Sequence, residues 1–132
     1  MEKITIVDDD IELAETIAMV LKKEGYDVEI VDNLGDGRTA IRERRPDLVI
    51  LDVMFPENLA GGFDLAREIR TASDTKDLPV ILLTAVNQEF PMDFSSGDID
   101  ENWIPVQDFI EKPPTIPDLL DKIKQLIADR SA

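Results

Sequence analysis

Three short apolar runs constrain the fold of this chain most strongly, because each one ends at a polar side chain. The runs cover residues 4–7, 48–51 and 80–83. The first is followed by three consecutive aspartates, the second by Asp52 and the third by Thr84. Apolar residues at consecutive positions are typical of strands buried on both faces of a helix-covered parallel sheet. The carboxyl ends of such strands form the functional edge, so we expect these polar side chains to meet there.

Turn and capping signals divide the rest of the chain into alternating elements. Asp10 is a good N-cap and Gly25 a good C′ residue for a first helix. The remaining expected elements are strands at 28–31, 47–51, 80–83 and around 109–110, and helices at 36–44, 63–70 and from Thr115 and Pro117 onward. This alternation predicts one α/β domain, residues 1–132, with a doubly wound sheet and flanking helices.

Residues 87–107 break the alternation. A fourth helix is expected there, but the segment contains Pro91, Pro105 and a Ser95-Ser96-Gly97 turn signal. Because an interior proline is costly in a helix, we predict that this helix is short, irregular, displaced or missing. The segment still carries large apolar groups beside acidic residues. Most are expected to fold back onto the sheet edge, and Phe94 and Trp103 are the better candidates for contacting a partner.

Composition excludes several classes of function. The 29 acidic and 14 basic residues give a net charge of −15, which argues against direct nucleic-acid binding. That acidity is explained either by solubility or by the steering of a basic partner. The chain has no histidine and no cysteine, which excludes serine-protease-type triads and thiol chemistry and makes a cytoplasmic setting the simpler interpretation. It also has no apolar stretch of membrane-spanning length.

The predicted edge has the residues for a metal and for phosphoryl chemistry. Asp8, Asp9 and Asp52 offer the oxygen ligands that Mg²⁺ (or Mn²⁺) prefers, and a cation would offset their mutual repulsion. The structural alternative is that residues 8–10 only cap the first helix, a role we assign to Asp10. An aspartate can also accept a phosphoryl group as an acyl phosphate. Lys112 and Thr84 end neighbouring strands and could contact its oxygens.

Four segments together resemble the receiver domain of two-component response regulators, in its single-domain, CheY-like form. They are Val7-Asp8-Asp9-Asp10, Leu51-Asp52-Val53-Met54-Phe55-Pro56, Leu83-Thr84-Ala85 and Phe109-Ile110-Glu111-Lys112-Pro113. The resemblance covers essentially all 132 residues and implies a five-stranded sheet of flavodoxin-like order 2-1-3-4-5. It also implies a signalling phosphoacceptor that catalyses only its own phosphorylation and dephosphorylation. The phosphodonor would be a histidine kinase or histidine phosphotransfer protein, and the output a downstream protein target.

The resemblance further implies a role for each motif residue. Asp52 would be the phosphoacceptor, and Lys112 would contact the phosphoryl group. Mg²⁺ would be bound by Asp9, Asp52 and the backbone carbonyl of Met54, while Asp8 would act mainly through metal-bound water. Thr84 and Phe109 would form the switch, and the Lys112–Pro113 bond would be cis. Taken alone, that dipeptide favours an ordinary trans bond. The loop after Asp52 and the stretch from Thr84 to Lys112 are both longer than is usual in the family.

Three functions remain to be distinguished. The leading one is a stand-alone phosphoryl switch, although a domain excised from a larger protein would have the same sequence. The second is an interaction module that has kept the fold without being phosphorylated. The third, a phosphohydrolase, is disfavoured because Met54 stands two residues after Asp52, where such enzymes commonly place a general acid.

Overall fold

A parallel sheet covered by helices on both faces forms the described part of the chain. The computed structural model describes residues 2–52, 55, 61–84, 108–111 and 115–131. Its elements are β1 (Lys3–Val7), α1 (Ile11–Lys23), β2 (Asp27–Val31), α2 (Leu34–Arg44), β3 (Leu48–Asp52), α3 (Gly61–Thr71), β4 (Val80–Thr84), β5 (Asp108–Glu111) and α5 (Ile116–Ser131). The five strands are parallel and lie in the order β2-β1-β3-β4-β5, which confirms the predicted fold.

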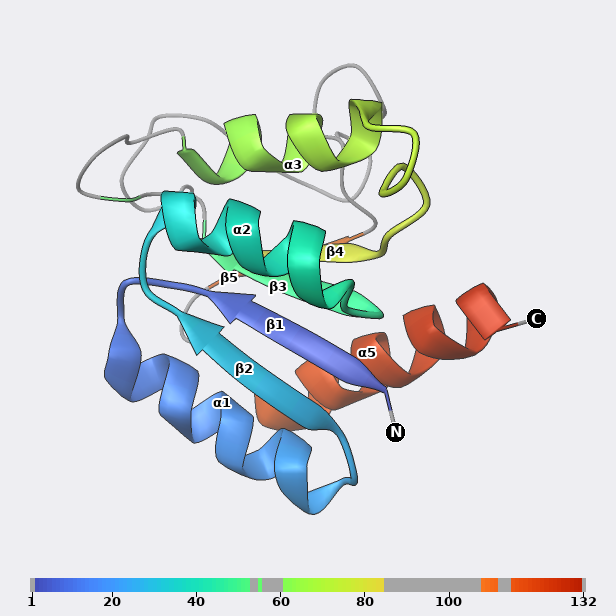
Figure 1. The fold of residues 1–132 in the computed structure, drawn as a ribbon. Helices are drawn as coiled ribbons and strands as arrows, with labels where there is room; N and C mark the ends of the chain where they lie inside the picture. The colour runs from blue at the N-terminus through green and yellow to red at the C-terminus, as the bar shows by residue number, and fades with distance from the viewer. Residues whose placement is uncertain (1, 53–54, 56–60, 85–107, 112–114, 132) are drawn as a thin grey trace.

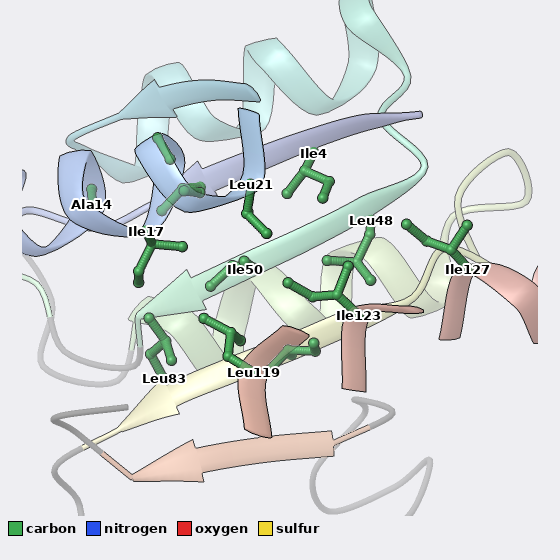
Figure 2. Close-up of a cluster of buried hydrophobic side chains, with 13 residues drawn as sticks. Ile4, Ala14, Ile17, Leu21, Leu48, Ile50, Leu83, Leu119, Ile123 and Ile127 are labelled. Atoms are coloured by element: carbon green, nitrogen blue, oxygen red, sulfur yellow. The ribbon is translucent and has the colours of Figure 1, made fainter. Parts of the chain in front are cut away.

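Two separate cores lie on the two faces of the sheet. On one face α2 and α3 cover residues such as Val7, Val49 and Leu82. On the other face α1 and α5 cover a second set, of which Ile4, Ala14, Ile17, Leu21, Leu48, Ile50, Leu83, Leu119, Ile123 and Ile127 are labelled in Figure 2. Every residue of β3 is buried, as expected for a strand at the middle of the sheet.

The helix ends agree with the capping signals, with one difference. Asp10 caps α1, and Gly25 takes the left-handed conformation with φ of 96° just after the helix ends. The second helix begins at Leu34, two residues before the predicted start at Asp36. The reason is that Asn33 is the N-cap, since its side-chain oxygen accepts a hydrogen bond from the Asp36 N–H at 2.8 Å.

Several predicted features lie outside the described residues. They are Met54, the 87–107 segment, where a short, irregular, displaced or missing helix is predicted, and the Lys112–Pro113 peptide bond. Thr84 and Phe109 are placed by their backbones, in β4 and β5, and their side chains are outside the description. Within the described ranges, no helix is both long enough and apolar enough to cross a bilayer.

Candidate metal and phosphoacceptor site

Three carboxylates converge at the carboxyl edge of the sheet. Asp8 directly follows β1, and Asp52 is the last residue of the neighbouring strand β3. The two strands are in register at Val7 and Leu51, so the next residue of each strand lies at the same level of the edge. Carboxylate oxygens of Asp8, Asp9 and Asp52 all lie within 4.8 Å of one another. The structure therefore brings together the three acids that the sequence predicts to meet.

Asp8 is held firmly by the backbone around it. Its N–H donates to the carbonyl oxygen of Val31 at 3.0 Å, which ties the end of β1 to the end of β2. Its Oδ1 accepts a hydrogen bond from the Asp10 N–H at 2.9 Å. The residue is fully buried, whereas Asp52 is 6% exposed. The site therefore has two acids fixed in a buried environment and one, Asp9, that faces solvent.

Asp10 has the separate role that the sequence predicts for it. Its Oδ1 accepts a hydrogen bond from the Leu13 N–H at 3.2 Å, which satisfies one of the unpaired donors in the first turn of α1. Asp10 is not a member of the carboxylate group. The run of three aspartates is thus divided between a helix cap and the acidic site.

The donor set fits a hard divalent cation. All three ligand candidates are carboxylates, and Mg²⁺ is commonly bound by one or two carboxylates, with waters and phosphate oxygens completing its octahedral shell. Three negative charges so close together repel one another, and a cation offsets this repulsion. Both arguments favour a cluster that could hold a divalent cation over a purely structural one.

The backbones of the other predicted site residues lie at the same edge. Asp52 pairs with Leu83 in the neighbouring strand. Thr84 is the last residue of β4 and therefore lies one position beyond the level of Asp52. Thr84 in turn pairs with Glu111, the last residue of β5. Lys112 follows immediately in the sequence and lies outside the described residues. The strand register places the backbone of Thr84 at this edge, and the convergence of its side chain on the acidic site stays a prediction.

Phe55 is a residue whose role the sequence interpretation did not identify. It is 1% exposed and belongs to the core under α2 and α3, together with Leu34 and Leu65. At the other side of the following loop, Gly61 begins α3 so close to Leu34 that a Cβ atom there would collide with its side chain. Both described ends of the loop after Asp52 therefore lie against one core. The only sequence signal for this packing is that an apolar residue, Phe55, stands three positions after Asp52.

Replacing Asp9 and Asp10 separately should distinguish metal binding from helix capping. We expect Asp9→Ala to weaken Mg²⁺ binding by about tenfold or more, since affinity depends on the number of charged ligands. Asp10→Ala should leave that affinity nearly unchanged and cost about 1 kcal/mol of unfolding free energy, because a cap is lost. Titration calorimetry and urea unfolding in EDTA measure the two quantities. Equal Mg²⁺ affinities in the two variants would contradict the assignment.

Comparisons with known proteins agree with this geometry. The family model described as the response regulator receiver domain matches residues 4–124. The chain is 42% identical over 84 residues to the DNA-binding response regulator MtrA of Mycobacterium tuberculosis, covering 64% of this chain and 35% of that protein. It is 32% identical over 124 residues to the phosphate regulon transcriptional regulatory protein PhoB of Pseudomonas aeruginosa, covering 94% of this chain and 51% of that one.

A solved structure shows the same fold. The response regulator receiver domain protein (CheY-like) from Methanospirillum hungatei aligns with a TM-score of 0.79 and 26% identity. That alignment covers 99% of this chain and 97% of the other. By contrast, the chain spans only 35% and 51% of the lengths of the two regulators above.

Proposed function

We propose that this chain, which belongs to the response regulator receiver domain family, accepts a phosphoryl group on Asp52 and signals that state to a protein partner. The observation that carries the proposal is the group of three carboxylates at the carboxyl edge of the sheet. Asp52 is its member at the end of the central strand. The donor is a histidine kinase or a histidine phosphotransfer protein, as the family membership suggests.

The proposed transfer is a single displacement at phosphorus. A carboxylate oxygen of Asp52 forms a bond to phosphorus while the bond to the donor's imidazole nitrogen breaks. The nitrogen keeps the electron pair, and the product is an acyl phosphate. Asp8, Asp9, Asp52 and the backbone carbonyl of Met54 are the residues that would hold Mg²⁺. When bound, the cation neutralises charge on the phosphoryl oxygens.

The remaining motif residues complete the proposal. Lys112 supplies a positive charge to a phosphoryl oxygen, and Thr84 donates its hydroxyl to another. The inward movement of Thr84 leaves space into which the ring of Phe109 turns, which is a packing change driven by local charge. The chain catalyses only its own phosphorylation and dephosphorylation. Its relative MtrA is named as a DNA-binding response regulator, but the net charge of −15 leads us to propose a protein target for this domain.

A small phosphodonor tests the proposal directly. Acetyl phosphate with Mg²⁺ should add a single phosphoryl group to the protein, and EDTA should prevent the addition. Intact-mass spectrometry of freshly treated protein measures both results. A protein that is never modified, with Mg²⁺ present and the fold intact by circular dichroism, would instead be the interaction module that has kept the fold.

A further inference from the structure

The outer edge of β2 is open for pairing. β2 is at the end of the sheet, and no described strand lies beyond it (Figure 1). The Asp27 N–H donates to the Glu2 carbonyl at 2.9 Å, and the Val31 carbonyl accepts from Asp8 at 3.0 Å. These two residues therefore bond toward β1. Because alternate residues of a parallel strand bond to the same neighbour, the backbone groups of Val28 and Ile30 face outward.

A groove runs beside this edge, between β2 and α2. It consists of two hollows, of about 560 Å³ and about 440 Å³. The first lies near the beginning of β1 and β2, and the second lies near the end of β2. Glu29, Glu43 and Arg44 line both hollows, so the two adjoin at these three side chains. We call this feature the β2–α2 groove.

The β2–α2 groove is strongly acidic. Its lining includes five carboxylates and two basic side chains: Asp27, Glu29, Asp32, Asp36 and Glu43 against Lys3 and Arg44. Arg44 is already engaged, because its Nε lies 2.7 Å from Oε2 of Glu29 in an ion pair without hydrogen-bond alignment. That oxygen is buried and accepts no hydrogen bond from the described residues. The groove therefore has an excess of negative charge, with five carboxylates against two basic side chains.

We propose that the β2–α2 groove binds an extended, lysine- or arginine-bearing segment of a partner protein. The segment adds to the open edge as an additional strand and hydrogen-bonds to the backbones of Val28 and Ile30. Its basic side chains on the α2 side contact Glu29 and Glu43. A second copy of this chain is a poor occupant, because it would bring another Asp27 and Glu29 against the same acidic edge. Charge complementarity thus selects a basic partner.

Defined peptides test the proposal on the full chain. The probe is a blocked heptapeptide of alternating lysine and valine, compared with a glutamate–valine peptide and with a lysine–valine peptide carrying a central proline. We expect the first peptide alone to shift the backbone amide NMR signals of residues 27–32. Neither Mg²⁺ nor a phosphodonor is present, so the result is independent of the proposed phosphoryl transfer.

Two charge reversals distinguish peptide binding in this groove from a general attraction to the negative charge of the protein. Glu43→Lys and Glu15→Lys change the net charge equally, but exposed Glu15 lies on α1 outside the groove. We expect Glu43→Lys to weaken peptide binding by about fivefold and Glu15→Lys to have little effect. Equal weakening, equal binding of the proline peptide, or no shift in residues 27–32 would overturn the proposal. Concentration-dependent dimerisation through β2, with no peptide binding, would assign the edge to a second copy instead.

Discussion

Asp52→Ala is expected to abolish the phosphoryl adduct that acetyl phosphate and Mg²⁺ produce on the wild-type protein. The substitution removes the only proposed nucleophile and one of the three acids that lie within 4.8 Å of one another. No change in metal concentration should restore the adduct, because alanine has no oxygen to form the acyl phosphate. Intact-mass spectrometry gives the modified fraction, and peptide mapping after borohydride reduction locates the site in the wild type.

Asp118→Ala is the matched control for this experiment. Asp118 is also an aspartate, but it is exposed in the first turn of α5 and is not part of the carboxylate group. This variant should be modified to the wild-type extent. If Asp52→Ala were modified equally well, another residue would be the acceptor, and the proposed role of Asp52 would be wrong.

Phe55→Ala is expected to lower the unfolding free energy by about 3–5 kcal/mol, since it removes a fully buried ring and leaves a cavity. The ring is 1% exposed in the core under α2 and α3. This is a large part of the roughly 5–15 kcal/mol that stabilises an ordinary domain. Urea unfolding in EDTA measures the loss without a contribution from bound metal.

Phe55→Leu is the control for that loss. Leucine keeps most of the apolar volume, so we expect a loss below about 1.5 kcal/mol. Similar, small losses for both substitutions would mean that the ring contributes little to the packing of this core.

The sheet and the acidic site could be predicted because both depend on local patterns. The apolar run at 48–51 requires a strand buried on both faces, and β3 has every residue buried. The position of Asp52 at the end of that run then determines which edge it occupies. Asp10 was assignable for the same reason, since a cap acts within one helical turn.

Contacts between distant segments could not be predicted in this way. Arg38 on α2 and Glu68 on α3 form an ion pair at 2.7 Å across 30 residues of sequence. Arg44 and Glu29 likewise join α2 to β2. In the sequence each of these residues is an ordinary charged residue, and only the packing of the helices on the sheet makes them partners. The β2–α2 groove depends on the same packing and was missed for that reason.

Phe55 and Gly61 lie against the same core, so the loop between them can change in length with little effect on the stability of the domain. Phe55 and Gly61, which precede and follow residues 56–60 in the sequence, are held by Leu34 and its neighbours. The entropy of closing a loop grows slowly with length, by about 0.6 kcal/mol for each doubling. Insertions between these two anchors should therefore cost little, and a receiver domain can acquire a longer segment there without rebuilding its core. This loop is thus a place where related domains can vary in length and sequence while the three carboxylates keep their positions.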